Sequence, residues 1–205
     1  DERRVHRRVL SASEIKSLYD QGVPDKLNSS VSQPQGKGRP ESGIAAYFPL
    51  DENTGTAAGD TSINTNNGTL TNGPTWTTGQ IGSAVDFDGT DDYVTVADKD
   101  VFDFVDSRNF ALSGWFNRDT FTTDDTIVAK RNGITAGDTG YILYIDDATD
   151  KLTFEASDGT DEYQLESVST FTATGWYYYT LVWNDSVSAS TRLYVNCIPE
   201  AATAT

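Results

Sequence analysis

From Gly43 onward the chain is a succession of short segments in which apolar and polar residues alternate, separated by clusters of Gly, Asn and Asp. Successive side chains of a strand point to opposite faces, so this alternation predicts strands with one buried face. The segments recur at intervals of roughly 8–15 residues with no helical pattern between them, which favours an all-β sandwich. We expect strands at 44–50, 84–87, 93–96, 110–116, 126–130, 141–145, 152–154, 163–168, 176–183 and 192–195.

Three dipeptides between these segments are typical of tight hairpin turns: Asp88-Gly89, Asn132-Gly133 and Asp158-Gly159. A two-residue hairpin turn requires positive φ angles, which Gly, Asn and Asp tolerate best. We therefore expect a hairpin at each of these positions.

The first 22 residues differ from the rest of the chain. Residues 3–10 alternate weakly and predict a strand. Ser11 and Glu14 then form a capping-box pattern, in which each side chain satisfies a backbone amide at the start of a helix. Gly22 and Pro24 are expected to end this helix after about two turns.

Residues 23–42 carry three Pro, two Gly and few apolar residues. Such a composition is typical of a solvated linker. We therefore divide the chain into a strand–helix segment (1–22), a linker (23–42) and a sandwich body (43–205).

The net charge of −16 is unevenly distributed. Residues 1–40 hold 8 basic and 5 acidic residues, whereas residues 41–205 hold 7 basic and 26 acidic ones. A surface this acidic repels phosphate backbones and argues against nucleic-acid binding, while it suits divalent cations. No apolar run approaches the roughly 18–20 residues that cross a bilayer, so we expect no membrane insertion.

Cys197 is the only cysteine, and the chain contains no Met. A single cysteine excludes both a disulfide within the chain and a zinc site of the Cys-x-x-Cys kind. We expect stabilisation beyond core packing to come from calcium, glycans or neighbouring chains. Because there is no initiator Met, we expect a processed product or a fragment.

Six motifs of the body occur in a recognisable order, at 44–55, 60–70, 87–94, 110–115, 175–177 and 192–196. Together they resemble the bacterial laminin-G-like modules of the concanavalin A-like lectin/glucanase superfamily. The resemblance implies an all-β, two-sheet jelly-roll sandwich, to which residues 1–22 add one short N-terminal helix.

The closing signature of that family, a strand followed by a short helix, is matched at the front of this chain, at residues 1–15. The match departs from the family pattern at Arg3, His6 and Arg7, and again at Cys197, where the family has Gly. The resemblance also implies that the body lacks its usual final strands after Asn196.

Two explanations of this displaced signature stay open: a piece of a tandem array, or an N-terminal strand that completes a sandwich. In the second, the strand closes either its own chain or a neighbouring copy, since a sandwich without its closing strand exposes unpaired amides. The residues expected to complete the sandwich are Val5, Arg7, Val9, Leu10, Ile15 and Leu18.

Calcium is the expected cofactor, because hard cations prefer oxygens from Asp, Asn, Ser and backbone carbonyls. The first candidate loop offers Asp60, Ser62, Asn64 and Asn67, and the resemblance places Asp1 and Glu2 near it. A second candidate is the acidic loop 88–92. The alternative for both loops is that these side chains satisfy their own turns.

The strand 176–183 carries aromatic residues on both of its faces. Trp176 and Tyr178 lie on one face and are the candidate ligand-binding residues, because exposed aromatic rings stack on sugars. Tyr177, Tyr179 and Trp183 lie on the other. Core packing of either set is the alternative.

Nothing in the sequence predicts catalysis. Glucanases of the superfamily place three acids at alternate positions of one strand, and this chain has no such E-x-D-x-E strand. Glu162 and Glu166 are four residues apart without an acid between them, and the adjacent Asp146 and Asp147 would face opposite ways. His6 lies in a strand that the family uses structurally.

These observations predict a non-catalytic, calcium-stabilised extracellular or cell-surface module that recognises a glycan or a surface protein. The alternative is a structural subunit of a surface fibre or array, whose copies are joined by strand complementation. Its partners are then other copies of itself.

Overall fold

The computed structural model of the chain describes residues 3–6, 10–21, 43–103, 109–119, 122–131, 138–184, 191–200 and 203–204. Several expectations fall outside this part of the chain. They are the metal candidates Asp1 and Glu2, the strand residues Arg7 and Val9, the linker 23–42, the turn Asn132-Gly133 and, for its side chain only, Leu18.

The described elements are almost all strands. The N-terminal segment forms β1 (Arg3–His6) and α1 (Ala12–Gln21). The body begins with β2 (Ile44–Phe48), β3 (Ala57–Ala58), β4 (Gly68–Thr71), β5 (Thr75–Thr78), β6 (Ser83–Asp86), β7 (Tyr93–Val96) and a 3-10 turn (Asp100–Phe102). It continues with β8 (Phe110–Arg118), β9 (Asp125–Arg131), β10 (Thr139–Asp146), β11 (Lys151–Asp158), β12 (Glu162–Thr170), β13 (Gly175–Trp183), β14 (Arg192–Val195), β15 (Ile198–Glu200) and β16 (Thr203–Ala204).

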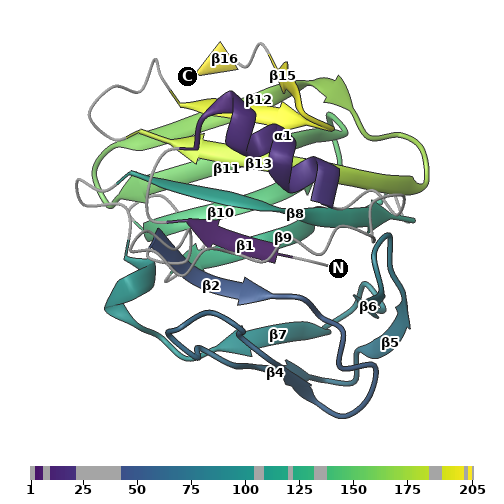
Figure 1. Ribbon diagram of the computed structural model, residues 1–205. Helices are drawn as coiled ribbons and strands as arrows, with labels where there is room; N and C mark the ends of the chain where they lie inside the picture. The colour runs from purple at the N-terminus through teal and green to yellow at the C-terminus, as the bar shows by residue number, and fades with distance from the viewer. Residues whose placement is uncertain are drawn as a thin grey trace.

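Two large antiparallel sheets form the body of the molecule (Figure 1). The six-stranded sheet has the order β15-β14-β13-β8-β1-β2, and the five-stranded sheet has the order β16-β12-β11-β10-β9. Two small sheets, β3-β4-β7 and β5-β6, lie beyond β2. The all-β class with one short helix is therefore confirmed.

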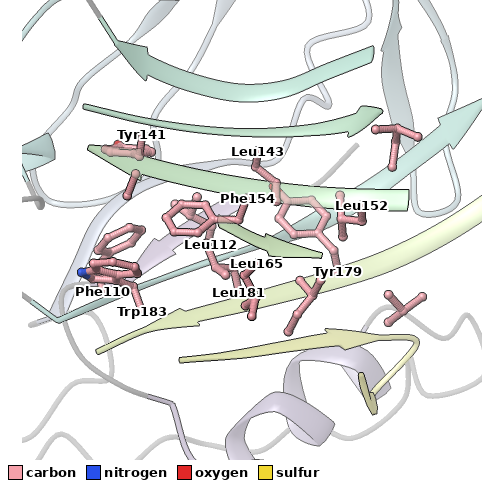
Figure 2. Close-up of a cluster of buried hydrophobic side chains, with 14 of the residues drawn as sticks. Phe110, Leu112, Tyr141, Leu143, Leu152, Phe154, Leu165, Tyr179, Leu181 and Trp183 are labelled. Atoms are coloured by element: carbon pink, nitrogen blue, oxygen red, sulfur yellow. The ribbon is translucent and has the colours of Figure 1, made fainter. Parts of the chain in front are cut away.

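The core lies between the two large sheets (Figure 2). Phe110 of β8 lies 5.3 Å from Tyr141 of β10, and Phe154 of β11 lies 5.5 Å from Trp183 of β13, measured between ring centroids. Alternate residues of each strand enter this core, so the remaining residues of β8 and β13 face outward.

The strand β1 lies inside the six-stranded sheet. Its backbone pairs with β2 on one side and with β8 on the other, so Val5 lies opposite both Ala46 and Leu112. The side chain of Val5 packs against the core. An N-terminal strand in this position removes two open edges from the sheet.

The helix α1 covers the outer face of β8 and β13 (Figure 1). Its capping box forms as expected: the Ser11 amide donates to Glu14 Oε2 at 2.8 Å, and the Glu14 amide donates to Ser11 Oγ at 3.3 Å. Leu10 and Ile15 pack on Ala111 and Val182. The helix has ten residues and is longer than expected.

Every expected strand of the body has a counterpart, while β3, β4, β5, β15 and β16 were not expected. The five missed strands have two to four residues each, and the two-residue strands β3 and β16 are too short to show any alternation. The turn between β14 and β15 is made by Asn196 and Cys197, with φ angles of 48° and 64°. Positive φ at both positions is the requirement of a tight hairpin turn.

The expected hairpin at Asp88-Gly89 is wrong. The Asp88-Gly89 turn joins β6 to β7, but these two strands do not pair with each other. β6 pairs with β5 and β7 pairs with β4, so this turn connects two different sheets. The hairpin at Asp158-Gly159 joins β11 to β12 as expected. Among the described residues, no helix is long and apolar enough to cross a bilayer.

Candidate functional site

The first predicted calcium loop is closed by its own hydrogen bonds. Asp60 is 5% exposed, and its Oδ1 accepts from the amides of Tyr47 at 2.9 Å and Ser62 at 2.8 Å. Its Oδ2 accepts from Ser62 Oγ at 2.8 Å and from the Asn66 amide at 2.7 Å. Each carboxylate oxygen thus accepts two bonds, and a cation could bind there only if some of them broke.

The asparagines of the loop hold it to neighbouring backbone. Asn67 Oδ1 accepts from the Asp60 amide at 2.9 Å, and Asn64 Nδ2 donates to the carbonyls of Ile44 and Ala45 at 2.9 and 3.0 Å. The loop therefore fastens β2 to the small sheets, which is the structural alternative that the sequence left open.

The second predicted loop brings three carboxylates together. Oxygens of Asp88, Asp91 and Asp92 lie within 4.8 Å of one another, a spacing that a metal ion could bridge. Asp88 Oδ1 also accepts from the Thr90 amide at 2.8 Å, and Asp92 Oδ2 accepts from the Asp88 amide at 3.1 Å. The loop is exposed and keeps oxygens available.

A third group of acids was not predicted from the sequence. Asp124, just before β9, joins Asp146 and Asp147 at the turn between β10 and β11, again with oxygens within 4.8 Å. The Asp147 amide donates to Asp124 Oδ1 at 2.9 Å. A side-chain hydrogen bond with Asp124, followed by some loss of solvation and the charges of Asp124 and Asp146, raises the pKa of Asp147. A cation would relieve this repulsion.

No sequence signal could have placed Asp124 beside the turn. The antiparallel register of β9 and β10, in which Asp125 lies opposite Ile145, brings the two segments together. From the sequence, Asp146 and Asp147 were considered only as a catalytic pair and rejected, because adjacent residues of a strand point apart.

The two predicted ligand-binding aromatic residues differ in burial: Tyr178 is buried and Trp176 is partly exposed. Tyr178 is 3% exposed, because Trp115 and Tyr19 of α1 lie at ring-centroid distances of 5.2 and 6.1 Å from it. A ring covered in this way offers no surface on which a sugar could stack. Trp176 is partly exposed, and Tyr177 packs on Phe116 inside the sandwich.

The outer face of the five-stranded sheet carries a hydrogen-bonded group of polar side chains. Because Leu143, Phe154 and Leu165 point into the core, their strand neighbours point outward. We call the following group the polar face: Arg131 of β9, Tyr144 of β10, Glu155 of β11 and Gln164 of β12.

Glu155 is the centre of the polar face. Its Oε2 accepts from Arg131 Nη1 at 2.8 Å, and its Oε1 accepts from Tyr144 OH at 2.8 Å and from Gln164 Nε2 at 3.3 Å. Burial and then the hydrogen bond to Glu155 raise the pKa of Tyr144 well above its usual value, so its hydroxyl stays a donor.

The side chain of Arg131 extends across the sheet toward Glu155 and Glu162. Its side chain is 10% exposed, with Nη2 3.7 Å from Glu162 of β12, and its Nε has no hydrogen-bond partner among the described residues. Gly140 and Ser157 lie between Arg131 and Glu162 in the cross-strand row. These two small residues leave space for the guanidinium to pass over the strands.

The glutamates on this side of the five-stranded sheet lie beside cations. Glu155 is held by Arg131, and Glu166 lies 3.1 Å from Lys151 Nζ. The polar face can donate and accept hydrogen bonds, which is the chemistry of binding.

The comparisons with known proteins point to one family. A laminin G model, described as concanavalin A-like lectin/glucanases superfamily, matches residues 88–205, which is more than half of the chain. The matched part contains the polar face and both acidic clusters. Comparison with curated proteins and with solved structures found no match.

Proposed function

Because the chain belongs to the laminin G family of the concanavalin A-like lectin/glucanases superfamily, we propose that it is a non-catalytic binding module outside the cell that recognises a glycan on its polar face. Modules of this family typically bind ligands and are typically extracellular. The ligand and the surface that binds it are our proposal.

The observation that carries the proposal is the set of bonds around Glu155. Four neighbouring strands each contribute one side chain, and three donors fix a single carboxylate. A binding site gains affinity when its polar groups are already held in place before the ligand arrives. Ile142, on the same face of β10, adds apolar surface beside these groups.

The charge of the surroundings selects the class of glycan. The body is strongly acidic, and its described cations are largely engaged: Arg118 with Asp125, Lys130 with Asp98, Arg131 with Glu155 and Lys151 with Glu166. Few cations remain to hold sulfate or carboxylate groups. We therefore expect a neutral or amine-bearing glycan rather than a sulfated or uronic one.

Calcium enters the proposal as a stabilising ion at the two exposed acidic clusters. Calcium takes six to eight oxygens, so three carboxylates supply part of its shell and backbone carbonyls or water complete it. The Asp88 and Asp124 clusters offer such donor sets. The Asp60 loop fits less well, because its carboxylate oxygens already accept hydrogen bonds.

Glycan binding is tested with the whole chain against immobilised neutral, amine-bearing and sulfated oligosaccharides, followed by calorimetry on the best ligand. Glu155→Gln should weaken binding roughly 10–100-fold, because a charge-assisted hydrogen bond is lost. Asp86→Asn removes the same charge at an exposed position on β6 and should have no effect. Unchanged affinity in Glu155→Gln, or binding of sulfated glycans only, would contradict the proposal.

The calcium proposal has its own test. An ion that binds only the folded chain must raise its melting temperature by mass action. Excess Ca²⁺ should therefore raise the melting temperature, and EDTA should lower it. Asp124→Asn should reduce the shift, and equal melting temperatures with Ca²⁺ and EDTA would contradict the proposal without touching the glycan site.

A further inference from the structure

The N-terminal strand and helix together fill a slot in the body. β1 is hydrogen-bonded on both sides, so its departure would leave unpaired backbone groups on β2 and on β8. Such open edges are the usual place where another strand adds to a sheet.

The helix fills the second half of the slot. Ile15 is 1% exposed and packs with Leu10 on Ala111 and Val182. Tyr19 continues the contact one turn later by stacking on Trp115, with ring centroids 6.0 Å apart. Without α1, this strip of apolar and aromatic side chains on β8 and β13 would face solvent.

The cover that α1 provides is imperfect. Ser113 and Thr180 lie opposite each other on β8 and β13, between the residues that meet Ile15 and those that meet Tyr19. They are 1% and 0% exposed, and neither hydroxyl has a hydrogen-bond partner among the described residues; the same is true of Trp115 Nε1. Buried polar groups left without partners weaken the packing that buries them.

We infer that residues 3–21 form an exchangeable segment, and that the slot of one copy takes β1 and α1 from a second copy of this chain. The contacts described above all join residues 3–21 to the body. They are therefore the same whichever copy supplies the segment, and the weakened cover allows the segment to leave. The inference does not rest on the glycan proposal, since the polar face lies on the other sheet.

Chain concentration decides which copy supplies the segment. A segment joined to its own body by a short tether has an effective concentration on the order of 1 mM. Copies should therefore close on themselves when dilute and exchange segments when concentrated. Exchange repeated from copy to copy is the step that assembly into a fibre or array requires.

The first test mixes isotopically heavy and light full-length chains and records native mass spectra. We expect monomers at about 10 µM and mixed heavy–light dimers after incubation at about 1 mM. Thr180→Val removes one buried hydroxyl without leaving a cavity, so it should slow the mixing about fivefold.

The second test adds a synthetic peptide of residues 1–22, carrying a fluorophore, to the full-length chain. Ile15→Ala in the chain weakens the hold of its own segment on the slot. The peptide concentration that half-saturates this chain should therefore be at least about 30-fold lower than for the unaltered chain. Ile15→Ala in the peptide instead of the chain should abolish capture, and a scrambled peptide is the matched control.

The inference is overturned if heavy and light chains never mix at about 1 mM and the peptide is not captured by either chain. Mixing that Thr180→Val leaves unchanged would also contradict it, because association would then not depend on how the slot is covered. If the Ile15→Ala chain fails to fold, the mixing experiment with Thr180→Val still tests the inference.

Discussion

Tyr19 of α1 stacks on Trp115 of β8, with ring centroids 6.0 Å apart and ring planes inclined by 27°. The two residues are almost a hundred positions apart in the chain, and their contact fixes the helix to the six-stranded sheet. Tyr178 completes the group in an edge-to-face contact with Tyr19, with ring centroids 6.1 Å apart. Tyr178, one of the two residues that the sequence presented as a ligand surface, is thus covered by the chain's own helix.

Tyr19→Ala should destabilise the fold by about 1–3 kcal/mol, less than the loss of a fully buried ring, because Tyr19 is only partly buried. It should also expose the Trp115 ring, so the tryptophan emission of the folded chain should shift to longer wavelength. Urea unfolding followed by fluorescence measures both effects.

Tyr19→Phe is the control for this prediction, since it keeps the ring and its stacking. Its midpoint in urea and its emission maximum should match those of the unaltered chain. An Ala variant as stable as the Phe variant would mean that α1 does not depend on this contact.

Stability should fall above pH 10 because of buried tyrosines. Burial, and next the charge of Asp103, raises the pKa of Tyr141 above its ordinary value of 10.0. Above about pH 10 the unfolded chain releases this proton while the folded chain keeps it, so the free energy of unfolding falls as pH rises. The slope from Tyr141 is about 1.4 kcal/mol per pH unit.

Tyr141→Phe should reduce that alkaline slope in urea unfolding series between about pH 9 and 11. Tyr144 and Tyr163 have pKa values raised by burial as well, and their smaller, solvent-screened contributions remain. Tyr93→Phe, at an exposed ring, is the matched control and should leave the slope unchanged. The same slope in both variants would contradict the assignment.

The pKa of Asp147 should depend on its neighbour. The hydrogen bond with Asp124 is the largest cause of the raised pKa, so Asp124→Asn should bring that pKa down. Added Ca²⁺ should lower it in the unaltered chain too, because a cation favours the ionised form. Carbon-detected NMR titration of the carboxyl groups measures both effects, and a pKa of Asp147 that Asp124→Asn leaves unchanged would refute the contact.

Cys197 occupies a turn position that glycine suits better. Its φ of 64° costs a residue with a Cβ about 1–2 kcal/mol, while the thiol gains some contact with the helix. Cys197→Gly should therefore be more stable than Cys197→Ala by about 1 kcal/mol in thermal unfolding. An Ala variant equal to the Gly variant would show that the turn carries no strain.

The sequence was sufficient for the strands that alternate over several residues, because alternation and burial have the same period. β8 and β13, which each have nine residues, were located within two residues at either end. Short strands such as β3 have no period to read, and Asp88-Gly89 resembles a hairpin turn although its flanking strands pair elsewhere.

The candidate site was less predictable, because it depends on register between strands. Arg131, Tyr144, Glu155 and Gln164 belong to four strands, and nothing local marks them as neighbours. The Asp60 loop shows the opposite limit: its residue types suit calcium, but the same oxygens also accept hydrogen bonds within the turn. Residue type gives the chemistry that is available, and the fold decides which of it is already used.

An ion-pair network around the buried side chain of Arg118, the last residue of β8, ties four parts of the sandwich together. Its Nε lies 2.6 Å from Asp125 Oδ2, and its Nη1 lies 2.5 Å from Asp150 Oδ1 and 3.0 Å from the Phe171 carbonyl. Asp125 and Asp150 flank the segments that carry the Asp124 cluster, so Arg118 positions that cluster.

Arg118→Met should cost about 2–4 kcal/mol of unfolding free energy, because two carboxylates lose a partner that is itself 3% exposed. High salt should reduce the loss only in part, since the guanidinium is buried while the two aspartates are partly exposed. It should also reduce the Ca²⁺-dependent rise in melting temperature, since Asp124 and Asp147 would no longer be held together. Lys99→Met, at an exposed lysine, removes the same charge and should change stability by less than about 0.5 kcal/mol. Equal stability of the two variants in urea would show that Arg118 is not the anchor of this end of the sandwich.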